Sequence, residues 1–127
     1  MDSQRFEELV FKAIEALPAE FKNKLENVDI LIEDLPSKAQ LRGLRLRHPI
    51  ELLGLYEGIP QTNRGGNYSF VLPDKITIFQ KSIESKCRSE REIEKEIGEV
   101  VRHEIAHHFG IGDDILRKIE KQKRAKK

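Results

Sequence analysis

Apolar and polar residues first alternate with the period of a helix. From residue 6 to residue 17 the apolar side chains recur at three- and four-residue steps, as they do on one face of an amphipathic helix. Asp2 or Ser3 can serve as its N-cap, and Pro18 ends the pattern. We therefore predict an N-terminal amphipathic helix that buries one face.

A second helical pattern fills residues 90–109. Ser89 and Glu92 form an S-x-x-E capping box at its start, and Gly110 follows its end. The apolar residues that recur every four positions in between are Ile93, Ile97, Val101, Ile105 and Phe109. The pattern predicts one long helix with a buried stripe.

Three segments carry strand signals. Alternating residues over 27–33 and the β-rich run over 75–80 each predict a strand. Residues 51–59 can form a third strand, broken by Gly54 and Gly58. A small sheet of about three strands is the expected result.

The remaining segments have weaker patterns. Residues 34–49 form a connection of uncertain structure, and a glycine- and asparagine-rich stretch predicts a loop over 61–69. Residues 113–127 predict a short C-terminal helix with an acidic start and a basic end. We expect its basic tail, 121–127, to fray.

These elements predict an α+β fold in one domain over residues 1–127. A chain of 127 residues fits a single modest core. A small mixed sheet would pack with the N-terminal helix and the long helix, and the short C-terminal helix would complete the domain.

Composition narrows the functional classes. Lys and Arg total 23 against 22 Asp and Glu, so net charge favours neither nucleic acid nor a membrane surface as a partner. Charged residues interrupt every apolar run, so we expect no signal peptide, no membrane span and a cytoplasmic location. The single cysteine, Cys87, is interpreted as a free thiol without a disulfide partner.

The strongest chemical signal is HEIAH at residues 103–107. His103 and His107 are four positions apart, so both imidazoles project from one helix face and can reach one metal ion. Glu104 lies about 100° further round the helix, near enough to accept a proton without being a ligand. Exposed His and Glu side chains with no metal are the alternative interpretation.

A catalytic zinc site requires a third protein ligand. Gly110 can take the left-handed conformation that ends a helix, and Asp113 is then the best-placed donor. Asp113 could instead cap the last helix, a role for which Asp114 is also available. His108 is predicted to be a hydrogen-bonded packing residue on the buried stripe, and His48 a surface residue.

Three segments resemble one protein family. HEIAHHFGIGD fits HExxHxxGxxD and, with LLGLYEGIP and LPDKITIFQ, resembles the minimal zincin-like metallopeptidases, which are small bacterial zincin domains. The resemblance covers roughly residues 5–120. It implies a zinc cofactor held by His103, His107 and Asp113, with Glu104 as the general base.

The chain departs from larger zincins in two respects. Its only methionine is Met1, so no methionine turn lies beneath the metal, and just 14 residues follow Asp113. The substrate cleft must be shallow, or a partner protein must complete it. A glutamate ligand from a later helix, as in other zincins, has only Glu120 as a candidate.

The predicted function is zinc-dependent hydrolysis of a peptide or protein substrate. The edge of residues 51–57 is one candidate to pair with the substrate backbone. Tyr56, Tyr68 and Arg64 are candidates to stabilise the oxyanion, although Tyr56 could equally be a core residue. Two alternatives remain: a non-catalytic zinc-binding or peptide-binding module, and a domain with no physiological metal.

Overall fold

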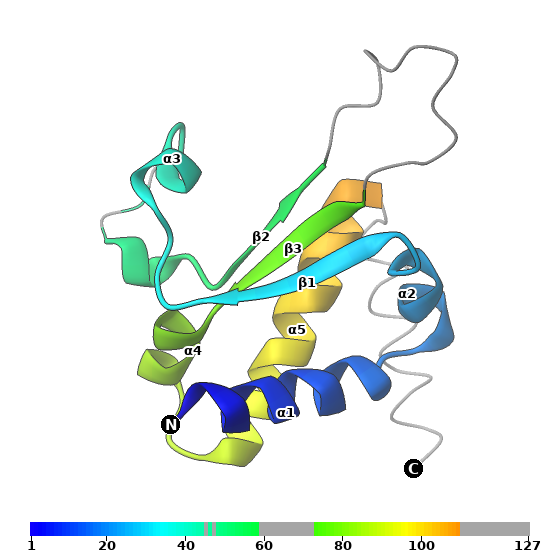
Figure 1. Ribbon diagram of the computed structural model, residues 1–127, viewed down its shortest axis with the longest axis horizontal. Helices are drawn as coiled ribbons and strands as arrows, with labels where there is room; N and C mark the ends of the chain where they lie inside the picture. The colour runs from blue at the N-terminus through cyan, green and yellow to red at the C-terminus, as the bar shows by residue number, and fades with distance from the viewer. Residues whose placement is uncertain (45, 47, 59–72, 110–127) are drawn as a thin grey trace.

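The computed structural model describes residues 1–44, 46, 48–58 and 73–109. In chain order its elements are α1 (Ser3–Glu15), α2 (Ala19–Lys24), β1 (Val28–Glu33), α3 (Lys38–Leu41), the 3₁₀ turn η1 (Pro49–Glu51), β2 (Gly54–Glu57), β3 (Asp74–Phe79), α4 (Gln80–Lys86) and α5 (Glu90–Phe109). Figure 1 shows how they are arranged.

The three strands form one mixed sheet with the order β1-β3-β2. The central strand β3 runs parallel to β1 and antiparallel to β2. Both β1 and β2 are therefore edge strands, and this sheet confirms the predicted α+β class.

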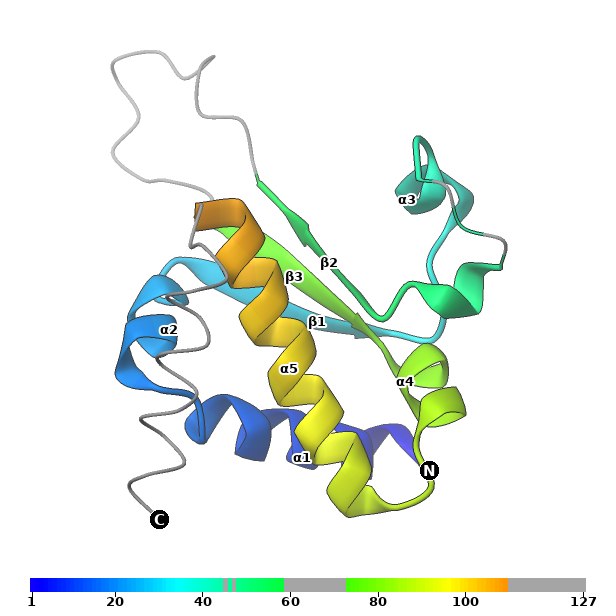
Figure 2. The ribbon, with the colours of Figure 1, turned by 180° about the vertical axis from the view of Figure 1, so that it is seen from behind.

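The two longest helices pack against each other, and α5 lies on one face of the sheet. Figure 2 shows α5 crossing the sheet face, with α1 packed against it. Ile76 and Ile78 of β3 point into this layer and are completely buried. The amphipathic stripes of both helices supply most of the other core residues, namely Phe6, Leu9, Val10, Ala13, Ile93, Ile97, Val101, Ile105 and Ala106. Burial of these apolar faces is the main stabilising contribution to the fold.

Several predicted boundaries agree closely with the structure. The long helix occupies 90–109 as predicted, and the first and last strands in the chain are shifted by one residue at most, to 28–33 and 74–79. The third predicted strand, 51–59, is shorter in the structure, because β2 extends only from Gly54 to Glu57 and Glu51 belongs to η1. The stripe of α5 also ends earlier than predicted, since Phe109 is 42% exposed.

Other predictions fall outside the described residues. They concern the loop 61–69 with Arg64 and Tyr68, and the C-terminal region from Gly110 onward, which includes Asp113, Asp114, Glu120, the last helix and the tail 121–127.

No helix in the described part of the chain combines the length and the apolar character needed to cross a membrane.

Candidate metal centre

The HEIAH segment lies in the last two turns of α5. Capping hydrogen bonds fix the start of this helix, and burial of apolar side chains fixes its later turns. At the start, the Ser89 hydroxyl accepts a hydrogen bond from the Glu92 backbone N–H at 3.2 Å, and the Glu92 carboxylate accepts one from the Arg88 N–H. These contacts satisfy donors that the first helical turn leaves unpaired. Downstream, burial of Val101 and Ile105 sets the rotation of the helix about its axis.

That rotation leaves both candidate imidazoles on the solvent side. His103 and His107 are exposed, and their ring centroids are 6.5 Å apart with an angle of 46° between the ring planes. Within the described residues neither side chain has a hydrogen bond or ion pair that would hold it away from a metal. Two neighbouring imidazoles on one helix face are the donor set that zinc prefers.

Glu104 is placed differently from the two histidines. Its side chain is half-buried, and its carboxylate accepts a hydrogen bond from the backbone N–H of Tyr56 in β2. Burial raises the pKa of Glu104, although the hydrogen bond and the neighbouring imidazoles act in the opposite direction. A carboxyl group with a raised pKa next to two imidazoles suits a group that accepts and returns a proton.

The contact between Glu104 and Tyr56 depends on a close approach of β2 to α5. A Cβ atom added to Gly54 would lie 2.5 Å from Val100 Cγ1, 3.3 Å from the Thr77 carbonyl oxygen and 4.0 Å from Glu104 Cγ. No side chain fits at Gly54 unless one of these groups moves. Glycine is therefore a steric requirement at this point of β2.

We expect Gly54→Ala to destabilise the protein by about 1–3 kcal/mol, the usual cost of overpacking a filled core. The added methyl group must displace buried Val100, whose β-branched side chain has few alternative rotamers. Urea unfolding measures the change.

Gly98→Ala in α5 is the matched control for this substitution. A Cβ there meets only the end of the Arg102 side chain, at 3.4 Å. Higher helix propensity should then make this variant as stable as the wild type, or more stable by up to about 1 kcal/mol. Equal stability of the Gly54→Ala protein and the wild type would show that β2 and α5 are not closely packed.

The third predicted ligand, Asp113, lies outside the described residues. Within them, no group of three or more His, Cys, Asp or Glu side chains is placed to hold a metal ion. His103 and His107 could serve as two of the three protein ligands that a catalytic zinc site needs. The two described imidazoles fit zinc as a partial set of ligands. A complete site needs at least one more donor.

A second cluster near HEIAH was not predicted. The Tyr56 hydroxyl donates a 2.8 Å hydrogen bond to Asp74 Oδ2, and His108 Nε2 lies 3.7 Å from the same oxygen. The Tyr56 and His108 rings are stacked at 3.8 Å. The candidate role of Tyr56 in stabilising an oxyanion is weakened, because its hydroxyl already donates to Asp74.

The prediction that His108 lies on the buried stripe was wrong, because its side chain is 37% exposed. The reason is helical geometry: His108 is four residues after Glu104 and so follows the face that meets β2. It does pack against Tyr56, as a packing histidine should.

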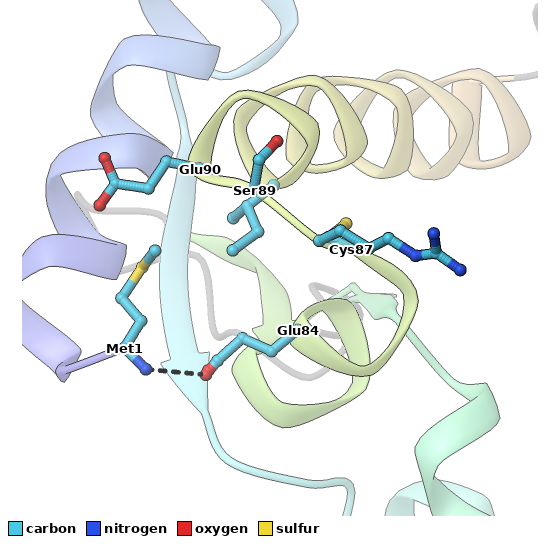
Figure 3. A pocket seen from close by; sticks show the side chains of 7 residues that line it. Met1, Glu84, Cys87, Ser89 and Glu90 are labelled. Atoms are coloured by element: carbon cyan, nitrogen blue, oxygen red, sulfur yellow. Dashed lines mark ion pairs between the residues drawn. The ribbon is translucent and has the colours of Figure 1, made fainter.

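An open hollow of about 400 Å³ lies at the other end of α5 (Figure 3). Its lining includes Cys87, Ser89 and Glu90, together with Met1 and Glu84, whose charged groups form a 3.7 Å ion pair. About 20 Å of helix separates Glu90 from His103, given a rise of 1.5 Å per residue. This hollow is therefore not part of the HEIAH site.

Comparison with protein families identifies the chain. The family model described as zincin-like metallopeptidase matches residues 25–123. The chain belongs to this family. The match spans all three strands of the sheet and the HEIAH helix. The elements that carry or contact His103, Glu104 and His107 therefore lie within it.

This zincin-like protein was also compared with solved structures and with curated proteins. A solved structure of a conserved hypothetical protein from T. thermophilus is similar at 27% identity and a TM-score of 0.55. The alignment covers 86% of this chain and 94% of that one. No curated protein matches the chain. Zincin-like metallopeptidases are generally zinc-dependent, which agrees with the two imidazoles of α5.

Proposed function

We propose that this zincin-like protein is a zinc-dependent metallopeptidase. His103, His107 and Asp113 would hold the metal, and Glu104 would act as the general base. The observation that carries the proposal is the contrast within one helical turn: two exposed imidazoles flank a half-buried carboxylate held by the edge strand. A merely solvated helix face gives no reason for Glu104 to be drawn toward β2.

The proposed chemistry is hydrolysis of a peptide bond. A zinc ion held by His103, His107 and Asp113 would supply Lewis acidity toward the scissile carbonyl and would make water a better nucleophile near neutral pH. Glu104 takes the proton from the attacking water and later delivers it to the leaving amine nitrogen. The hydrogen bond from the Tyr56 N–H would orient the Glu104 carboxylate while it does so.

A peptide or protein is the proposed substrate, and β2 is the proposed edge for its backbone. The sheet has two edges, β1 and β2, and α5 contacts β2. Of the two edges in the described sheet, β2 has the more extensive contact with the helix that carries HEIAH. An extended substrate strand paired with that edge would bring its carbonyl groups near Glu104.

A partner protein and a cellular location complete the proposal. Because both imidazoles are exposed, we propose that a second protein adds walls to the cleft. We place the enzyme in the cytoplasm, where its lone thiol, Cys87, stays reduced. Neither nucleic acid nor a membrane is proposed as a partner.

Metal removal tests the proposed activity. We expect the zinc-loaded protein to cleave members of a quenched fluorescent peptide library, and a chelator to abolish that cleavage. One equivalent of zinc should restore it, whereas magnesium should not, since imidazole ligands favour zinc. Cleavage that continues in chelator-stripped protein would contradict the proposal.

A non-catalytic module that binds zinc or a peptide is the second candidate. The exposure of both imidazoles favours it, because catalytic sites usually exclude water from the reacting groups. Zinc binding without cleavage of any library peptide would support this alternative.

A further inference from the structure

The second cluster joins three segments that are distant in sequence. Tyr56 lies in β2, Asp74 begins β3, and His108 is in the last turn of α5. Tyr56 donates its hydroxyl hydrogen to Asp74 Oδ2 at 2.8 Å. Its ring lies flat against His108, with 18° between the ring planes and 3.8 Å between the centroids. The same carboxylate oxygen is 3.7 Å from His108 Nε2, so one acidic group contacts both rings.

Neighbouring residues extend this contact over the end of α5. The Phe109 ring meets Tyr56 edge-on at 6.2 Å and His108 edge-on at 4.9 Å. The ammonium group of Lys24 lies over the Phe109 ring at 4.7 Å. Aromatic pairs in these geometries attract one another beyond simple burial of area. The last turn is therefore attached to the sheet and to α2 through its side chains.

The last turn of α5 needs such an attachment. The buried stripe ends at Ile105 and Ala106, and His107, His108 and Phe109 are all at least partly exposed. The final carbonyl groups of a helix lack partners within the helix, so its last turn tends to fray. Without contacts to the sheet, the backbone that carries His107 would be the least constrained part of the helix.

Tyr56 also contacts α5 a second time. Its backbone N–H donates to the Glu104 carboxylate, one turn before His108. Burial and the hydrogen bond to Asp74 raise the pKa of Tyr56 to about 12, so its hydroxyl remains a neutral donor at physiological pH. One residue of β2 therefore holds the proposed general base through its backbone and the last helical turn through its ring.

We propose that Tyr56, Asp74 and His108 form a positioning cluster that fixes the last turn of α5 and thereby orients His107 toward the metal. This proposal rests on the proposed function, because it takes His107 as a metal ligand. Metal sites bind tightly when their ligands are held in place before the ion arrives. Outer groups that orient a ligand commonly change metal affinity by about 10–100-fold.

Tyr56→Phe tests the cluster with the smallest change. The ring can still stack on His108, but the 2.8 Å hydrogen bond to Asp74 is lost. We expect zinc to bind about tenfold more weakly, measured by competition with a chromophoric chelator. The visible spectrum of the cobalt-substituted protein should also change, because it reports ligand geometry rather than overall stability.

Glu90→Gln is the matched control on the same helix. It weakens the contacts of Glu90 with Arg5, at 2.8 and 3.0 Å, at the opposite end of α5. This variant should bind zinc and display the cobalt spectrum as the wild type does. In metal-free protein, amide hydrogen exchange at residues 106–109 should be faster in Tyr56→Phe and unchanged in Glu90→Gln.

The outcomes separate this proposal from the proposed function. If the wild type binds zinc, and folded Tyr56→Phe has the same affinity and cobalt spectrum, the positioning proposal alone is overturned. If the wild type binds no zinc, the proposed function and the orientation of a ligand by the cluster are both overturned. Weaker binding by Tyr56→Phe together with normal binding by Glu90→Gln supports the cluster.

Discussion

Replacing Glu104 with glutamine should lower kcat for peptide hydrolysis by about 10²–10⁴-fold, the usual contribution of a positioned general base. Glutamine keeps the size of the side chain and can still accept the Tyr56 N–H, but it cannot take a proton from water. Zinc should remain bound, because Glu104 is not among the proposed ligands. Turnover and zinc content measured on the same preparation give both results.

Glu94→Gln is the control for this experiment. Glu94 lies in the same helix, and the substitution makes the same change of charge away from HEIAH. This variant should retain wild-type turnover. If Glu104→Gln also retained it with zinc bound, another group would be the base and the proposed mechanism would be wrong. Loss of turnover in Glu104→Gln would also show that the cleavage seen with the wild type does not come from a contaminating protease.

The main helices and strands could be predicted because local signals marked their ends. The helix 90–109 has a capping serine at its start, a four-residue apolar repeat and a glycine just after it, and α5 has the predicted bounds. The strand 28–33 has β-branched residues on alternate positions, and the strand 74–79 has three in succession, so both strands could also be predicted. Each signal depends on neighbours within a few residues.

Two short helices were missed for different reasons. In α3, Ser37 and Gln40 form a complete capping box, so a sequence signal existed and was overlooked. In α4, no side chain caps the start, and polar Gln80 and Ser82 are buried beside Ile83. Contacts with η1 and α5 hold α4 in place, and local sequence does not encode them.

The candidate site also has one part that the sequence predicts and another part that only the fold brings together. The spacing of His103 and His107 is local, so the sequence alone could place both on one face of α5. Tyr56 and Asp74 are 18 residues apart and meet only through the pairing of β2 with β3. The segments LLGLYEGIP and LPDKITIFQ carry part of the family resemblance, and the sequence alone assigns no contact between them. The structure places Tyr56 of the first segment and Asp74 of the second in contact with each other and with the end of the HEIAH helix.

Removing one proposed zinc ligand should have the largest effect on metal binding. His107→Ala leaves His103 as the only imidazole on that face of α5, and zinc affinity should fall by more than the roughly 10–100-fold caused by loss of an outer partner. The exposed side chain of His107 has no core contacts to lose, so the fold should be unaffected. His48→Ala, which removes an imidazole beside η1, should bind zinc as the wild type does.

Calorimetric titration of zinc into chelator-stripped wild-type protein, with His107→Ala and His48→Ala measured beside it, shows whether HEIAH forms a metal centre. We expect one tight site per chain in the wild type and in His48→Ala, and loss of that tight site in His107→Ala. No tight site in the wild type, or a site that His107→Ala retains at full affinity, would contradict a metal centre built on HEIAH.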